Sequence, residues 1–161
     1  MKAASVKEIK SALEDLPTPE LVDLCLRLVK FKKENKELAT YVLFDEANEP
    51  AYIGSVRESL DLLFADVHKT NPYYAKKTLR KIVRVANKFI RYSSHESTGV
   101  DILLFVAERM RPLYLDMKKS TALENIYLGV VKKIKKLTSG LHEDLQYDYL
   151  RQLNKIESLP K

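Results

Sequence analysis

Apolar residues recur every three or four positions along almost the whole chain, which is the spacing of one side of an α-helix. Short polar segments and cap-plus-proline pairs such as Asn71-Pro72, which typically start a helix, interrupt this repeat. No run alternates β-branched and polar residues as a half-buried strand does. The pattern predicts an all-α protein of about eight helices, near residues 5–16, 18–33, 35–44, 50–67, 71–92, 98–110, 121–137 and 141–156.

The connections between these helices are short, so successive helices should lie side by side and antiparallel in a single all-helical domain, residues 1–161. A compact bundle and a short HEAT-like solenoid of helix pairs both fit this order, because no fixed repeat period is visible. The segment 102–107 is apolar nearly all round, so its helix should be central and packed on several sides. Pro112 should bend or end that helix.

Capping residues predict several helix boundaries. Ser5 and Glu8 have the spacing of a capping box, and Thr121 and Glu124 have the same spacing further along the chain. Asn35 should cap the third helix. The apolar side of that helix should point inward, with Leu38, Tyr41, Val42 and Phe44.

The cysteine count and the hydropathy indicate a compartment. Cys25 is the single cysteine and cannot form an internal disulfide, and it lies on the apolar stripe of its helix. We therefore expect a buried thiol in a reducing cytoplasm. The first residues lack the apolar core of a signal peptide, and no apolar run approaches the roughly 18–20 residues that span a bilayer. A cytoplasmic protein without a membrane partner is expected.

Positive charge is concentrated in one segment. The formal net charge is +6, yet residues 67–95 contain eight Lys or Arg and no Asp or Glu, which leaves 20 basic against 22 acidic residues elsewhere. On a helical wheel at about 100° per residue, six of these cations share an arc of roughly 100°, opposite the apolar side of their helix. We call these six residues the basic stripe: Lys77, Arg80, Lys81, Arg84, Lys88 and Arg91.

The basic stripe has three interpretations. Most charged helix surfaces are simply solvated, but like charges at i,i+4 repel by a few tenths of a kcal/mol, so an acid-free stripe favours a partner. We expect an acidic protein partner or self-association. Tyr73 and Tyr74 lie beside the stripe, and cations next to aromatic rings also suit nonspecific nucleic-acid binding. The KKIKK cluster at 132–136 either extends this patch or only complements the dipole of its own helix.

No catalytic or metal-binding pattern occurs in the sequence. His68, His95 and His142 lie in no HExxH or Glu-x-x-His pair, and the chain has no glycine-rich phosphate loop and no nucleophile elbow. We therefore predict no metal, no cofactor and no small-molecule ligand, and a non-catalytic binding or scaffolding module. An enzyme whose site is assembled from residues far apart in sequence is the remaining alternative.

The stretches KEIKSALEDLPTPELVDLCLRL and KELATYVLFDEANEPAYI resemble small all-helical proteins of Bacteroidetes-type bacteria to which no function is assigned. This resemblance covers roughly the first third of the chain, and it implies a bacterial, cytosolic origin and no site residue. The stretch after Asn71 resembles a helix pair of HEAT-type solenoids, such as those of DNA alkylation repair proteins. That second resemblance implies a fold only.

Overall fold

The computed structural model describes residues 2–116 and 120–158, and it places side chains throughout these ranges except at residues 114–116. All regular structure among the described residues is helical and none of them lies in a strand, so the predicted all-α class is confirmed. The chain divides into two compact units, Met1–Phe44 and Asp45–Lys161. The assignment of residues 1–161 to a single domain stays a prediction.

The first unit is a series of short helices. It contains α1 (Val6–Glu14), α2 (Thr18–Phe31) and α3 (Lys33–Thr40), and a π-helical turn begins at its end (Tyr41–Asp45). The predicted capping box of α1 is confirmed, because the Ser5 hydroxyl accepts a hydrogen bond from the Glu8 backbone N–H (3.3 Å) and the Glu8 carboxylate accepts one from the Ser5 N–H (2.7 Å). This box satisfies two N–H groups that the helix itself leaves unpaired.

Several predictions for this unit are wrong. Asn35 does not cap α3, which already begins at Lys33; its side chain instead donates to the backbone oxygen of Leu28 at 2.8 Å and closes the corner between α2 and α3. Cys25 is exposed rather than buried. A helical period identifies an apolar side, but it does not supply an element to cover that side. For the same reason only Tyr41 of the four inward-predicted residues is buried, while the other three are exposed: Leu38, Val42 and Phe44.

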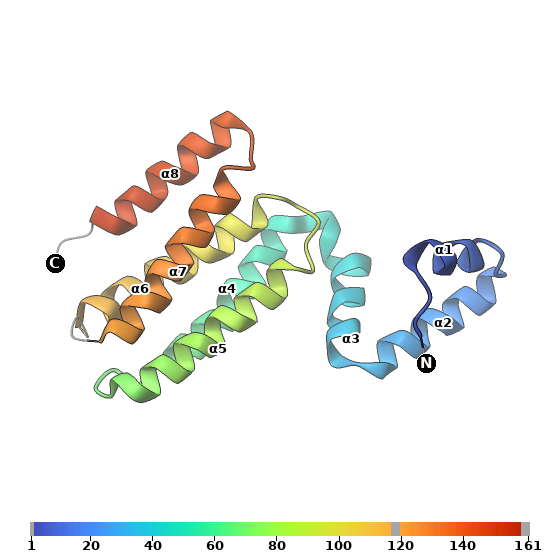
Figure 1. Cartoon of the computed structure of the whole chain (residues 1–161), viewed down its shortest axis with the longest axis horizontal. Coiled ribbons are helices and arrows are strands. Elements are labelled where there is room, and N and C mark those ends of the chain that lie inside the picture. The colour runs from blue at the N-terminus through green and yellow to red at the C-terminus, as the bar shows by residue number, and fades with distance from the viewer. Residues whose placement is uncertain (1, 117–119, 159–161) are drawn as a thin grey trace. The chain divides into compact units, whose positions relative to one another are not determined.

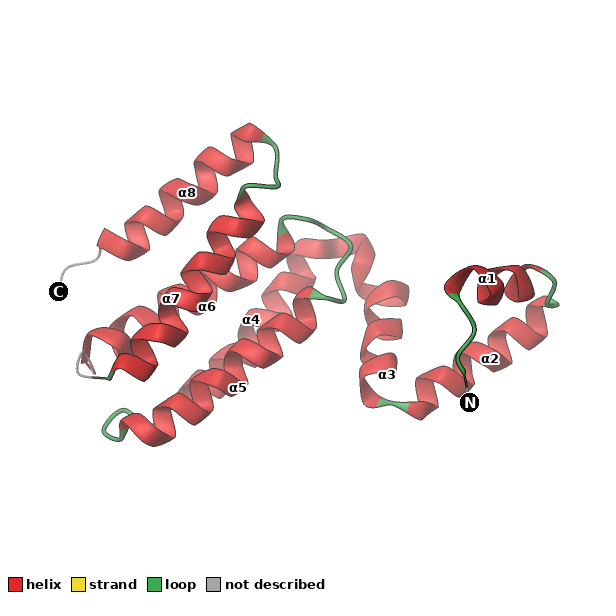
Figure 2. Cartoon of the chain, viewed as in Figure 1, coloured by secondary structure: helices red, strands yellow, loops and turns green. Residues whose placement is uncertain are grey.

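The second unit consists of two layers of helices. After a short 3-10 turn (Glu46–Asn48) it contains α4 (Glu49–Ala65), α5 (Pro72–Ile90), α6 (Thr98–Asp116), α7 (Thr121–Thr138) and α8 (Glu143–Ser158). Helices α4, α6 and α8 lie side by side in one layer and α5 and α7 form the other, with successive helices antiparallel (Figure 1). The connections are short (Figure 2), as expected for neighbouring antiparallel helices.

Helix α6 is the centre of this unit. It packs against α4, α5, α7 and α8, and Ile102, Leu103, Val106 and Ala107 have no exposed surface. The expectation of a central helix around residues 102–107 is therefore confirmed. Pro112 lies inside α6, and the helix continues to Asp116, so this proline does not end the helix. The packing on all sides of α6 outweighs the backbone hydrogen bond that the proline removes.

The helix starts of the second unit follow the capping predictions in one case and depart from them in another. Helix α5 begins as predicted: the Asn71 side chain accepts from the Tyr73 N–H at 3.0 Å, and Pro72 occupies the first turn. Helix α7 lacks the predicted capping box, because Ser120 is its N-cap residue and Thr121 is already helical. The box requires its first residue outside the helix, so a boundary shift of one residue removes it.

The carboxylate of Glu49, at the start of α4, holds the connection between α5 and α6. It accepts hydrogen bonds from the hydroxyl of Ser93 at 2.6 Å and from the buried Thr98, and it lies 3.8 Å from the His95 ring. Nearby, the Tyr52 hydroxyl donates to the backbone oxygen of Phe89 at 2.9 Å. These bonds tie the last turn of α5 to the first turn of α4.

A second polar contact joins α8 to α6. The Tyr149 hydroxyl donates to the Asp101 carboxylate at 2.9 Å. Burial raises the pKa of Asp101, and burial together with the adjacent carboxylate raises the pKa of Tyr149 to about 12. Both shifts follow from removing the charged forms from water. The pair thus keeps its phenol proton over the whole neutral range.

Two leucines of α4 test this packing. Leu60 has no exposed surface, so Leu60→Ala should lower the free energy of unfolding by about 2–5 kcal/mol, measured by urea denaturation. Leu62 lies two positions along the same helix and is 74% exposed. Leu62→Ala should therefore change the free energy by less than about 0.5 kcal/mol. Equal effects of the two substitutions would contradict the orientation of α4.

Candidate binding face on helices α5 and α7

The basic stripe lies on the exposed side of α5. The apolar side of α5 is buried as expected, with Leu79, Ile82 and Ala86 in the core. On the opposite side the cations Lys77, Arg80, Lys81, Arg84 and Arg91 are exposed, and Lys88 is half-buried with its ammonium group over the Phe89 ring. Helical spacing alone produces this separation, because residues three and four apart share one side of a helix.

Within residues 2–116 and 120–158, no ion pair neutralises the exposed cations of the stripe. No acidic side chain in the described part of the chain forms an ion pair with any of them. Helix α5 also contains no acidic residue of its own. The i,i+4 repulsions between Lys77 and Lys81 and between Arg80 and Arg84 are therefore not offset by an ion pair among the described residues. The five cations concerned are Lys77, Arg80, Lys81, Arg84 and Arg91.

Two cations elsewhere in the second unit are paired with acids, in contrast to the exposed cations of the stripe. In the layer of α4, α6 and α8, Arg109 donates to the Asp61 carboxylate at 2.7 Å. Lys135, on the side of α7 that borders α8, lies 3.6 Å from Glu157. These two cations thus have carboxylate partners, which the exposed cations on the outer surface of α5 do not have among the described residues.

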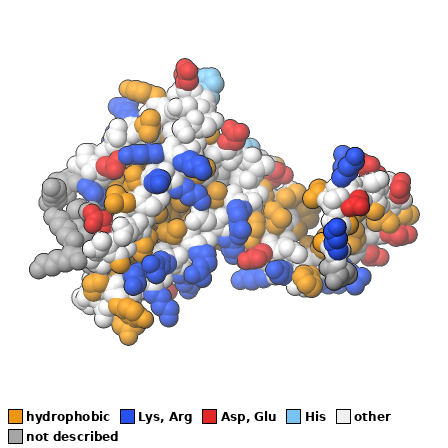
Figure 3. Space-filling view, in the orientation of Figure 1, with side chains coloured by type: hydrophobic (Ala, Val, Ile, Leu, Met, Phe, Trp, Pro, Cys, Tyr) orange, Lys and Arg blue, Asp and Glu red, His pale blue; other side chains and the backbone are white. Residues whose placement is uncertain are grey.

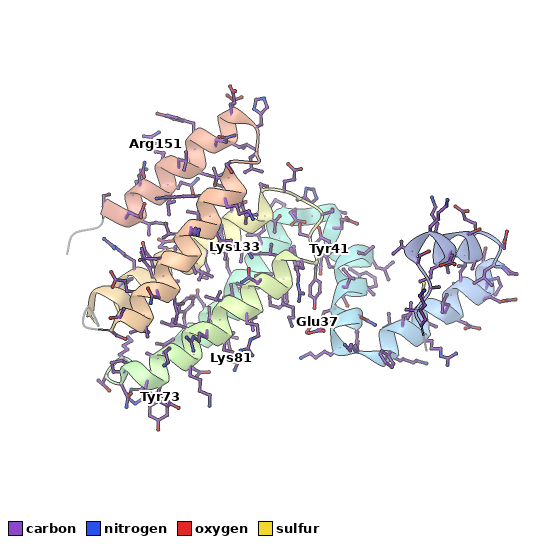
Figure 4. The ribbon with its side chains drawn as sticks, viewed as in Figure 1. Glu37, Tyr41, Tyr73, Lys81, Lys133 and Arg151 are labelled. Atoms are coloured by element: carbon purple, nitrogen blue, oxygen red, sulfur yellow. The ribbon has the colours of Figure 1, made fainter. Side chains whose placement is uncertain are left out.

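Helix α7 continues the positive surface. Lys133 donates a hydrogen bond to the Asn87 side chain of α5, which joins the two helices directly. Lys132, Lys133 and Lys136 are exposed and share an arc of about 100° on α7, opposite its buried side. Figure 3 shows Lys and Arg atoms gathered over these helices, and Figure 4 shows Lys81 and Lys133 on the two neighbouring elements. The basic stripe and these three lysines together are called the basic face.

Burial and a neighbouring cation both act on the pKa of Lys133. Partial burial lowers the pKa of this ammonium group, and the positive charge of Arg91 lowers the pKa further. Burial acts because the charged form loses hydration, and Arg91 acts because like charges repel. An anion placed between the two helices would stabilise the charged form of Lys133 and so oppose both effects.

A groove runs between α5 and α7 and has a floor formed in part by α6. Its volume is about 240 Å³. The floor is apolar, whereas the rim is basic or carries amides. Gly129 leaves its wall open, because a Cβ added there would meet no atom within 4 Å. The lining residues are Arg80, Val83, Asn87, Leu103, Asn125, Ile126, Gly129, Val130 and Lys133.

Tyr73 and Tyr74 lie at the start of α5, at one end of the stripe and outside the groove (Figure 4). They are 66% and 54% exposed, and their rings meet edge to face with centroids 5.4 Å apart. Lys76 lies 5.6 Å from the centre of the Tyr73 ring. The structure therefore places the two predicted tyrosines together, but as a pair at the end of the cations rather than between them.

Groups that suit metal chemistry or membrane insertion are absent from the described ranges. Residues 2–116 and 120–158 contain no cluster of three His, Cys, Asp or Glu side chains that could hold a metal ion. No described helix is both long enough and apolar enough to cross a bilayer. The histidines are spread over the chain, with His68 near Thr70, His95 near Glu49 and His142 near Asp144.

Comparison with protein-family models, with curated proteins and with solved structures finds no match to this chain. The candidate face therefore rests on its own geometry and charge.

Several residues of the groove were not predicted from sequence. Asn87 and Lys133 meet although 46 positions separate them, and no local pattern reveals that contact. Gly129 and Ile126 acquire their importance only because α7 lies beside α5. One local signal was present: the outward side of α7 from Asn125 to Lys136 carries lysines and no acid.

The coupling between Arg91 and Lys133 can be tested directly. Arg91→Gln should raise the pKa of Lys133 toward 10.5, because it removes the nearby positive charge. NMR titration of ¹³C-methylated lysines measures this value. Arg84→Gln is the matched control, since the same charge change on the same helix should shift the Lys133 pKa less. An equal shift in both variants would show that Arg91 has no special proximity to Lys133.

Proposed function

We propose that the protein is a binding or scaffolding module whose basic face binds an acidic segment of a protein partner. The observation that carries this proposal is the groove between α5 and α7, which combines an apolar floor with an unneutralised basic rim. Carboxylates on a partner would restore the charge balance that α5 lacks. Complementary charge of this kind favours rapid and selective association.

The apolar floor favours a protein over a phosphate backbone as the occupant. Val83, Leu103, Ile126 and Val130 line a space of about 240 Å³, which suits an aliphatic side chain. An acidic peptide segment can insert such a side chain while its carboxylates meet Arg80 and Lys133 on the rim. A sugar-phosphate backbone offers the charge without the aliphatic group.

The scaffold is consistent with this role. Helices α4, α6 and α8 in one layer and α5 and α7 in the other support a HEAT-like stack of helix pairs, and stacks of this kind present extended binding surfaces. We also assign the protein to the cytoplasm, because the exposed single thiol of Cys25 suits a reducing compartment.

A short fluorescent peptide of glutamates with one central leucine tests this function by anisotropy. It should bind at low salt, and Arg80→Glu/Arg84→Glu should weaken binding by about tenfold or more, because one rim charge and one neighbouring charge of the basic stripe are reversed. Lys2→Glu/Lys7→Glu changes the net charge equally, but in the first unit, and should leave the affinity unchanged. Absence of binding, or equal loss in both double variants, would reject the proposal.

The groove itself has a separate control. Gly129→Leu adds a side chain at the open wall, where its Cβ meets no atom within 4 Å, and leucine also suits a helix better than glycine does. The substitution should weaken binding of the leucine-containing peptide and leave the affinity for a peptide with serine at the central position unchanged. If both peptides respond alike, the apolar floor is not part of the binding site.

The exposed tyrosine pair supports a second candidate, which is nonspecific binding of single-stranded nucleic acid. Tyr73 and Tyr74 provide open ring surfaces next to Lys76 and Lys77, and bases stack on such rings with about 1–3 kcal/mol per base. Phosphates would then follow the cations along α5.

Fluorescence anisotropy with a labelled single-stranded oligonucleotide decides this candidate. Binding should be present at roughly 50 mM salt and should fall steeply as salt is raised, because phosphate contacts release counterions. Tyr73→Ala/Tyr74→Ala should weaken binding by about tenfold, whereas Tyr147→Ala, which truncates an exposed tyrosine on α8, should not. Failure to bind at low salt excludes nucleic acid.

A further inference from the structure

The first unit exposes more apolar surface than a folded protein ordinarily leaves in water. None of the residues of α1, α2 or α3 is buried. Of the 17 large hydrophobic residues that are exposed in the described chain, 10 lie between Val6 and Phe44. Helices of 9, 14 and 8 residues are marginal by themselves, and so small a unit rarely builds a sufficient core. Contact with another surface would remove the exposed apolar side chains of this unit from water and stabilise it.

The apolar surface of helix α2 includes a strip with charges along one flank. Val22 and Leu26 are about half exposed and lie one turn apart, with the half-buried Val29 continuing the strip. With Val22 at zero on a helical wheel, Leu26 falls near 40°, whereas Asp23 and Lys30 fall near 100° and 80°. An acid and a base therefore occupy the same edge of the strip, two turns apart.

The order of these two charges along α2 determines in which direction a second copy of the helix can pack against it. Asp23 and Lys30 are exposed, and neither forms an ion pair with any residue in the described part of the chain. If two copies of α2 pack antiparallel, the same edge of each helix meets, so Asp23 of one copy lies beside Lys30 of the other, twice. A parallel pair in register would instead place this edge of one helix beside the opposite edge of the other, so that Asp23 and Lys30 would not meet across the interface.

We propose that two copies of the protein associate through α2, packed antiparallel about a twofold axis, with Val22, Leu26 and Val29 of each copy buried between them. The interface is isologous, since each copy contributes the same strip and the same two charges. The strip supplies the affinity through apolar burial, and the Asp23–Lys30 pairs set the direction. This surface lies in the first unit, whereas the basic face lies in the second.

The charge order of α2 also suits its own helix dipole, with acid near the N-terminus and base near the C-terminus. A test must therefore separate pairing between copies from stabilisation within one helix. Charge exchange does so, because only a contact between copies can be restored by mixing two different variants.

Sedimentation equilibrium of the full chain provides the test. The wild-type protein should dimerise, and Asp23→Lys and Lys30→Asp should each weaken the dimer at least about tenfold, because each creates two repulsive pairs. An equimolar mixture of the two variants should form a heterodimer with the wild-type affinity. The double variant Asp23→Lys/Lys30→Asp should dimerise by itself.

Cys25 reports the direction of pairing. It lies near −60° on the same wheel, on the opposite edge of the strip, and close to the midpoint between Asp23 and Lys30. Antiparallel pairing brings the two exposed thiols near the twofold axis, so a short bismaleimide should link wild-type chains through Cys25, and Leu26→Asp should abolish the link. A monomeric wild-type protein, single variants that dimerise normally, or a mixture without heterodimer would each overturn the proposal. Loss of peptide binding at the basic face would leave it unaffected.

Discussion

The burial of α6 is the constraint on which the second unit depends. A helix that is apolar on nearly every side loses stability wherever water reaches it, so α4, α5, α7 and α8 must surround it with their own apolar sides. Once those sides are committed to the core, the polar side of every surrounding helix must point outward. The location of the positive surface is therefore a consequence of how the core is closed, and the arrangement of α5 next to α7 brings two basic helix surfaces together.

Local sequence predicted those features that local physics determines. The apolar period and the Asn71-Pro72 start defined α5 well, and the uniform hydrophobicity of residues 102–107 identified the central helix. Predictions failed where the result depends on a neighbour. Cys25 has the periodic position of a core residue, yet it is exposed. Asn35 has a side chain that could cap a helix, but its amide donates to the Leu28 carbonyl instead. The groove between α5 and α7 was beyond local reasoning because its walls come from three helices.

The two units differ in how completely their apolar residues are buried. Around α6, apolar residues are matched by neighbours and disappear from the surface. In α2, residues of the same kind remain half in water because the unit is too small to enclose them. Hydrophobic periodicity is equally clear in both cases, so the period measures which side of a helix can be buried, whereas the count of surrounding elements decides whether it is.

The hydrogen bonds around Glu49 hold the positive surface in a fixed conformation, which its charge alone would not do. A disordered lysine-rich tail could carry as many cations, but it would lose conformational freedom on meeting a partner. Here the Tyr52 hydroxyl anchors the last turn of α5 to α4, and Glu49 anchors the following connection through Ser93 and Thr98. The cations from Lys77 to Arg91 extend over about 21 Å at 1.5 Å per residue. Helix α5 therefore holds its cations at fixed distances from one another. It can discriminate between partners by the spacing of their charges as well as by their number.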